Sequence, residues 1–108
     1  MNFNKLINFN NLKKEAKLFK KNKPFNYLVV DDFFESNFAK KLESEIPNYN
    51  DNIWHEYNNP IEVKKLTNNW NNFKTNTYVT FSYLTSDKFT NILEKILNIK
   101  NLINDPGL

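Results

Sequence analysis

The stretch PFNYLVVDDFFESNFAKKLESEIP, residues 24–47, decides the fold of this chain. Its four consecutive apolar residues, 27–30, predict a strand over 26–30 that is buried on both faces. Asp31 and Asp32 then form an acidic corner. Adjacent side chains of an extended chain point to opposite faces, so we interpret one aspartate as a turn residue and the other as solvated, in preference to a metal pair.

The second half of this stretch predicts an amphipathic helix over 36–46. Ser36 is a good N-cap, and Phe38, Leu42 and Ile46 lie one turn apart on what we expect to be the buried face. Pro47 ends the helix. The stretch therefore predicts a strand, a corner and a helix in that order.

Residues 1–23 are expected to form a basic lead-in helix, followed by a second region over 24–108. Asn10 or Asn11 is the candidate N-cap, and Pro24 should end the helix by about Asn22. The apolar positions recur at helical spacing: Leu12, Ala16 and Phe19. The lysines are interpreted as a solvated helix face: Lys13, Lys14, Lys17, Lys20, Lys21 and Lys23.

Residues 48–58 are predicted to be an aromatic loop that precedes a short helix. In the sequence Asn59-Pro60-Ile61-Glu62, an N-cap, a first-turn proline and a glutamate at the third position predict a helix that runs to about Leu66. Trp70 and Phe73 are interpreted as anchors that pack on the core.

The segment 74–84 is ambiguous between strand and helix. Its threonines and valine favour a strand, whereas Tyr78, Phe81 and Leu84 also fit one side of a helix. Downstream, Ser86 is expected to cap a helix that ends at a left-handed Asn98. Asp87 lies in the first turn of that helix, and its apolar face is Phe89, Ile92, Leu93, Ile96 and Leu97.

Composition limits the protein class. The chain has 108 residues, 40% hydrophobic and 16% aromatic, which suits one folded domain. Without cysteine it has neither disulfides nor thiolate metal sites. Its first ten residues lack the uninterrupted apolar h-region that a signal peptide has, and no apolar run reaches transmembrane length. We therefore expect a soluble, cytoplasmic protein without a membrane partner. A single glycine, Gly107, is too few for the turns of a complete β-barrel.

Candidate chemistry is sparse. His55 is the only histidine, and Tyr57 stands where a facial triad of two histidines and a carboxylate needs its carboxylate. We interpret His55 as a loop residue packed between Trp54 and Tyr57. The aromatic set Trp54, Tyr57, Trp70 and Phe73 is interpreted as core, with a ligand groove as the alternative. We therefore assign no catalytic, cofactor-binding or metal-binding residue.

Three stretches resemble the prolyl-hydroxylase-like family of 2-oxoglutarate/Fe(II)-dependent dioxygenases. The first, Phe25 to Pro47, looks like the family's aromatic–x–x–hydrophobic–Asp–x–Phe opening and the helix that follows it. The second is similar to a segment of one branch: Trp54-His55-x-Tyr57-x-Asn59-Pro60-x-Glu62-x-Lys64, then Asn69-Trp70 and Phe73. The third resembles the segment before the catalytic barrel: Ser86-x-x-Phe89-x-x-x-Leu93-Glu94, then Ile99-x-x-Leu102-Ile103-x-Asp105-Pro106.

The resemblance covers about 25–108 and implies an α+β fold. Its helices and short strand would buttress a double-stranded β-helix, or jelly roll, whose catalytic part is not in this chain. The family's His-x-Asp pair, distal histidine and basic 2-oxoglutarate ligand follow the Asp-Pro turn, so no functional residue is carried over. The resemblance also favours a helix over 74–84.

We therefore expect the N-terminal, structural portion of a dioxygenase. Fe(II) and 2-oxoglutarate are implied for the whole enzyme and are not bound by this chain alone; the barrel would lie in the same or a separate chain. The alternative is a free-standing interaction module that binds a partner through the aromatic loop 54–73. A nucleic-acid binder ranks last, because the net charge of +3 is mild and no nucleic-acid-binding motif is present.

Overall fold

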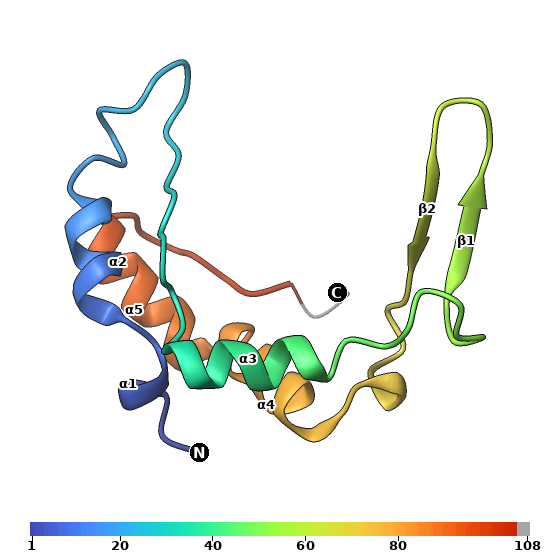
Figure 1. The fold of residues 1–108 in the computed structure, drawn as a ribbon. Coiled ribbons are helices and arrows are strands. Elements are labelled where there is room, and N and C mark those ends of the chain that lie inside the picture. The colour runs from blue at the N-terminus through green and yellow to red at the C-terminus, as the bar shows by residue number, and fades with distance from the viewer. Residues whose placement is uncertain (106–108) are drawn as a thin grey trace.

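The computed structural model describes residues 1–105, which form a helical body and a projecting hairpin (Figure 1). In chain order the helices and strands are α1 (Phe3–Leu6), α2 (Phe9–Ala16), α3 (Ser36–Ser44), β1 (His55–Asn58), β2 (Val63–Leu66), a 3-10 turn (Trp70–Asn72), α4 (Thr75–Leu84) and α5 (Asp87–Leu97). Strands β1 and β2 form a two-stranded antiparallel sheet. The described part is thus a small α+β fold, as expected at the level of class.

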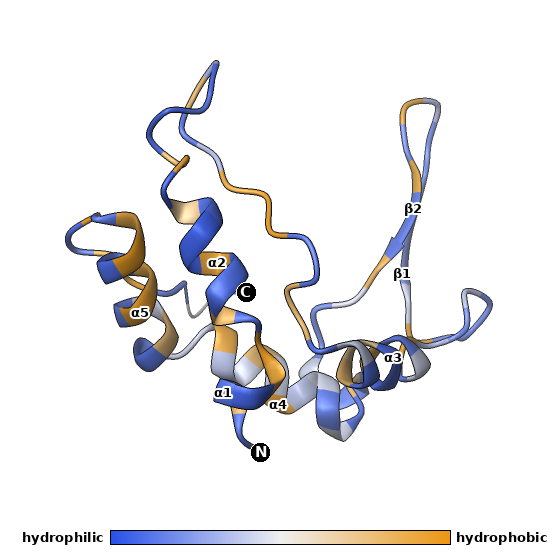
Figure 2. Ribbon diagram, turned by 60° about the vertical axis from the view of Figure 1, so that its left-hand side comes forward, coloured by the Kyte–Doolittle hydropathy of each residue, from blue (hydrophilic) through white to orange (hydrophobic). Residues whose placement is uncertain are grey.

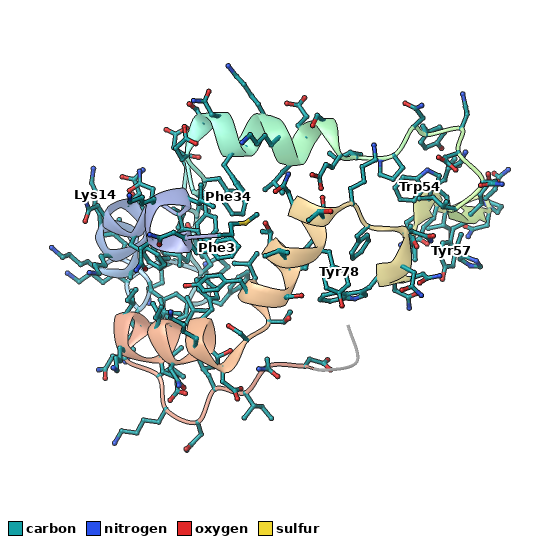
Figure 3. The ribbon with its side chains drawn as sticks, turned by 90° about the horizontal axis from the view of Figure 1, so that it is seen from below. Phe3, Lys14, Phe34, Trp54, Tyr57 and Tyr78 are labelled. Carbon is teal, nitrogen blue, oxygen red and sulfur yellow. The ribbon has the colours of Figure 1, made fainter. Side chains whose placement is uncertain are left out.

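The core of the helical body combines side chains from the first and the last described helices, α1 and α5. Its buried cluster consists of Phe3, Ile7, Leu12, Phe38 and Phe89. The Phe3 ring stacks on Tyr83 of α4, with the ring centroids 4.2 Å apart and the planes 11° apart. Figure 3 shows Phe3 and Phe34 directed into this body, whereas Lys14 points away from it. The first residues of the chain therefore contribute side chains to the same core as α3 and α5.

Helix α5 forms where its sequence predicts it. The Ser86 hydroxyl accepts a hydrogen bond from the Phe89 N–H at 3.2 Å, and Asp87 lies in the first turn. Asn98 ends the helix in the left-handed region, at φ 53° and ψ 49°. All of these features are local, and all are confirmed.

Two N-cap assignments are wrong by a few residues. Helix α2 is capped by Asn8, whose side chain accepts from the Asn11 N–H, so neither Asn10 nor Asn11 is the cap. Helix α3 is capped by Glu35 in place of Ser36, because the Glu35 carboxylate accepts from the N–H groups of Asn37 and Phe38. These hydrogen bonds hold the pKa of Glu35 below its usual value.

The helix predicted over 36–46 ends early, and its face is only partly covered. Helix α3 stops at Ser44, and a turn precedes Pro47. Phe38 is buried and Leu42 is half-buried, but the Ile46 side chain is 66% exposed. The apolar stripe thus extends beyond what the described residues bury.

The strand predicted over 26–30 does not form. This segment is extended, and Leu28 and Val30 pack against the core while Tyr27 and Val29 face solvent. Among the described residues no strand pairs with it; instead, the Asn22 side chain donates to the Tyr27 carbonyl at 2.8 Å. The predicted burial on both faces is also wrong, since only Leu28 and Val30 are covered. An apolar run favours extended backbone, but a strand requires a hydrogen-bonding neighbour.

The helix predicted over 59–66 is a β-hairpin. Residues pair in the register His55↔Leu66 to Asn58↔Val63. Asn59 accepts from the N–H groups of Ile61 and Glu62, the same hydrogen bonds that an N-cap makes. Hydrogen bonds of this kind can either start a helix or close a turn. Here they close a turn, and the residues after Glu62 continue as strand β2.

The described chain is less compact than its size predicts. Its Cα radius of gyration is 16.2 Å, whereas a compact chain of this length has about 13 Å. The accessible surface is 8462 Å², against about 6300 Å² for a folded monomer of this mass. The helices therefore leave more surface in contact with solvent than a self-contained globular domain does.

Candidate functional site

The residues considered for chemistry from sequence do not converge. Asp31 and Asp32 are both exposed at the corner between 30 and 33, where Asp32 has a positive φ of 50°. The Asp31 carbonyl accepts from the Asn11 side chain at 3.2 Å. Their carboxylates are surface groups of a turn.

His55 lies at the start of β1, exposed to solvent, and its ring meets Tyr57 edge-on with centroids 4.7 Å apart. Trp54 instead directs its Nε1–H to the Asn48 carbonyl at 2.8 Å. Within residues 1–105, no three His, Cys, Asp or Glu side chains lie close enough together to hold a metal ion. The described residues therefore do not offer a fit for iron.

The four aromatic residues that the sequence suggested as a core or a ligand groove lie in two different parts of the structure. Tyr57 projects on the hairpin, whereas Trp70 and Phe73 pack on α4, where the Trp70 ring lies 5.3 Å from Tyr78 and the Phe73 ring lies 5.5 Å from Phe81. Figure 3 shows Trp54 and Tyr57 near the hairpin and Tyr78 on α4. Trp54 and Phe73 line one pocket together, with a volume of about 210 Å³.

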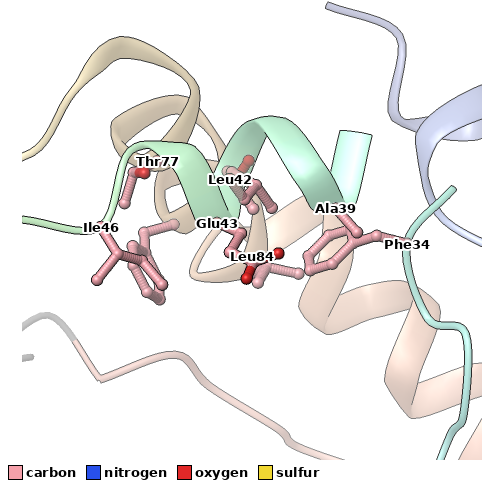
Figure 4. A pocket seen from close by; sticks show the side chains of 9 residues that line it. Phe34, Ala39, Leu42, Glu43, Ile46, Thr77 and Leu84 are labelled. Atoms are coloured by element: carbon pink, nitrogen blue, oxygen red, sulfur yellow. The ribbon is translucent and has the colours of Figure 1, made fainter. Parts of the chain in front are cut away.

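A strongly apolar groove lies between α3 and α4 (Figure 4). This α3–α4 groove has a volume of about 390 Å³ and is lined by Phe34, Ala39, Leu42, Glu43, Ile46, Thr77, Thr80, Phe81 and Leu84. Phe81 is 44% exposed beside the exposed Ile46. The Thr80 hydroxyl is buried at this groove and has no hydrogen-bond partner in the described part of the chain.

Glu45 links the end of α3 to the start of α4 through hydrogen bonds. It follows α3, and its carboxylate accepts from both the N–H and the hydroxyl of Thr77, at 2.8 and 2.9 Å. It also accepts from the Asn76 side chain at 2.7 Å. Lys74, the residue at the N-cap of α4, supplies no side-chain cap of its own, so a carboxylate from another helix caps α4.

Burial of Glu45 by itself raises the pKa of its carboxyl. The hydrogen bonds from Thr77 and Asn76 outweigh that effect, so the net pKa lies below its ordinary value. A carboxylate at the start of a helix is also favoured by the helix dipole. Glu45 is therefore ionised at neutral pH and fixes α4 against the end of α3.

Sequence reasoning missed this groove because residues 74–84 were ambiguous. Propensity favoured a strand, and only the resemblance and the spacing of Tyr78, Phe81 and Leu84 favoured the helix that is observed as α4. The Glu45 contact has no local signal, since it joins residues more than thirty positions apart.

Comparison with known proteins identified no similar protein. No family model, no curated protein and no solved structure matches this chain. In residues 1–105, none of the helices has both the length and the apolar character that a membrane crossing requires.

Proposed function

We propose that residues 24–108 are the helical support of a cytoplasmic, prolyl-hydroxylase-like 2-oxoglutarate/Fe(II)-dependent dioxygenase domain. Their role is structural: α3 and α5 buttress the sheet of a jelly-roll barrel that lies in the same or a separate chain. The order of the three motif stretches supports this family assignment, and the helix α4 agrees with it.

One observation carries the structural part of this proposal: the α3–α4 groove is open and apolar. Its floor and rim include Leu42, Ile46, Phe81 and Leu84, and the whole described chain has about 2000 Å² more accessible surface than expected for its mass. An apolar face of this kind is normally covered by another layer of structure. A barrel sheet packed on α3, one of the two proposed buttressing helices, would also cover α4 beside it and would supply that layer.

The proposal assigns no chemistry to the described residues. Fe(II) supplies oxidation chemistry when bound in such an enzyme, but residues 1–105 contain no grouping of side chains that fits it. The iron and 2-oxoglutarate ligands would belong to the barrel. Iron binding by the 108-residue chain alone would contradict the structural role.

The first test is to sequence the coding DNA beyond codon 108 and to measure the intact mass of the native protein. An in-frame glycine-rich strand, then His-x-Asp and a later histidine, would support the proposal. A native mass equal to residues 1–108, with no barrel chain co-purifying, would contradict it.

A second test measures whether the α3–α4 groove is open in solution. The 108-residue chain should enhance the fluorescence of 8-anilinonaphthalene-1-sulfonate, and Ile46→Ser with Phe81→Ser should remove most of that signal. The matched control is Ile61→Ser, which removes an equally apolar but isolated side chain that is 93% exposed at the hairpin tip. Equal losses in both variants would contradict an apolar groove.

The second candidate function is a free-standing interaction module that binds through residues 54–73. The projecting β1–β2 hairpin favours it, since Tyr57, Ile61 and Val63 expose apolar surface there (Figure 1). This alternative predicts one cooperative thermal transition of residues 1–108 alone and no dye binding at α3 and α4. The dioxygenase proposal predicts dye binding at α3 and α4.

A further inference from the structure

A second groove lies between the N-terminal helices and α5. It has a volume of about 470 Å³ and is lined by Asn4, Phe9, Lys13, Ile92, Lys95 and Ile96. None of these residues lines the α3–α4 groove. We call it the α2–α5 groove; Figure 2 shows α5 with a broad hydrophobic face and α2 as mostly hydrophilic.

The floor of the α2–α5 groove is apolar, and its edge is positive. Phe9, Ile92 and Ile96 are half-buried, whereas Lys13 and Lys95 are exposed. No carboxylate lines this groove. The ion pairs found in the described residues lie in the hairpin, at Lys64 and Lys65, so the two groove lysines have no acidic partner there.

The N-terminal segment that contributes to the groove also carries a net positive charge. Residues 1–23 contain seven lysines and one glutamate, a formal charge of +6, while residues 24–108 contain eight lysines and eleven acidic residues, a formal charge of −3. Lys17 follows Lys13 by one turn, and the Lys20 ammonium donates to the Asn98 carbonyl at 3.1 Å. That contact ties the end of the lysine run to the end of α5.

We propose that the α2–α5 groove binds an acidic amphipathic helix of a partner protein. Apolar side chains of that helix, spaced three and four residues apart, would cover Phe9, Ile92 and Ile96. Its flanking carboxylates would pair with Lys13 and Lys95. The added helix completes a three-helix layer with α2 and α5, and it uses none of the residues that line the α3–α4 groove.

A second copy of this chain does not fit that description. Lysines equal or outnumber acidic residues in every described helix: α1, α2 and α3 have an excess of lysine, α4 has neither, and α5 has two of each. None of them offers the acidic rim that Lys13 and Lys95 require. The described helices therefore do not supply the occupant, and the proposal assigns it to a partner protein.

The test uses fluorescence anisotropy of a labelled synthetic peptide of about 16 residues, long enough to form a helix. Its leucines form one face and its glutamates the other. We expect saturable binding to the full chain that weakens at least about tenfold for Lys13→Glu with Lys95→Glu. The control, Lys40→Glu with Lys41→Glu on α3, makes the same change of net charge at exposed sites and should alter affinity less than about threefold. Circular dichroism of each variant checks that the helices are retained.

Several results would overturn the proposal. One is the absence of saturable peptide binding up to about 1 mM. Another is equal weakening by both lysine pairs, or equal binding by a peptide with serine in place of leucine, since either shows non-specific charge attraction. Sedimentation with anionic vesicles, or dimerisation of the chain, that depends on Lys13 and Lys95 would assign the groove to a membrane or a second copy instead.

Discussion

The Glu45 carboxylate accepts two hydrogen bonds from a single residue, the backbone N–H and the hydroxyl of Thr77, through the same oxygen. The second oxygen accepts from Asn76. Asn76 and Thr77 are the second and third residues of α4, whose N–H groups have no partner within the helix. One side chain thus satisfies the exposed donors of a helix that begins about thirty residues away.

Replacing Glu45 should loosen α4. Glu45→Gln keeps the size of the side chain but removes the charge that strengthens these hydrogen bonds, so the free energy of unfolding should fall by about 1–2 kcal/mol in urea denaturation. Glu43→Gln is the matched control: Glu43 is exposed and its carboxylate makes no hydrogen bond in the described structure, so its replacement should have little effect. Equal losses would show that the contact does not hold α4 in solution.

Acid should destabilise the fold through Glu45 and Glu35. Both carboxyls have a pKa below the ordinary value of 4.5 in the folded state, so the unfolded chain binds protons first as pH falls. The stabilisation is complete above about pH 5 and is lost as pH falls through the lowered pKa values. Urea midpoints should therefore decrease between about pH 6 and about pH 3, with a smaller decrease in Glu45→Gln. A variant curve parallel to that of the wild type would assign the pH dependence to other groups.

Phe3 should be a major stabilising residue although it lies at the very start of the chain. It is 8% exposed and stacked on Tyr83, so Phe3→Ala should cost about 3 kcal/mol. Phe25, 67% exposed, is the control, and Phe25→Ala should change stability by less than about 0.5 kcal/mol. Thermal unfolding followed by circular dichroism measures both variants. A small effect at Phe3 would show that the N-terminal residues are not part of the core.

Two substitutions of the left-handed Asn98 should change the stability of the protein in opposite directions. Asn98→Gly should stabilise the protein by about 0.5 kcal/mol, and Asn98→Val should destabilise it by about 1 kcal/mol, because a branched side chain is strained at positive φ. Asn91→Val, at an exposed position inside α5, controls for helix propensity and should be close to neutral. Urea denaturation decides; identical effects of valine at both positions would contradict the left-handed cap.

The hairpin should open independently of the helical body. Asn59→Ala removes the acceptor of the Ile61 and Glu62 N–H groups and should lower amide-exchange protection across β1 and β2 by roughly tenfold. The global unfolding midpoint should not change, because an isolated two-stranded sheet adds little stability. Asn52→Ala, in the exposed loop before β1, is the control. Protection lost throughout α4 as well would show that the hairpin and body are coupled.

The candidate groove could be predicted only in part. The face of α3 is visible in the spacing of Phe38, Leu42 and Ile46, but the position of α4 against it depends on Glu45. The aromatic set was a poor guide because Tyr57 and Trp70 belong to different substructures, the hairpin and the α4 surface. A high density of aromatic residues in the sequence does not show which rings contact one another, because that depends on the path of the backbone.

By itself the sequence determined the elements whose hydrogen-bond partners lie only a few residues away along the chain. Helix α5 needs only its own apolar spacing, the Ser86 hydroxyl three residues from its partner, and Asn98 at its end. Tertiary structure alone decided the rest: residues 26–30 remain without a strand partner among the described residues, Asn59 closes a hairpin and not a helix, and Glu45 caps α4 from a distance. The physical reason is that backbone donors and acceptors must be satisfied in every case, and when the partner is remote, local residue preferences cannot specify it.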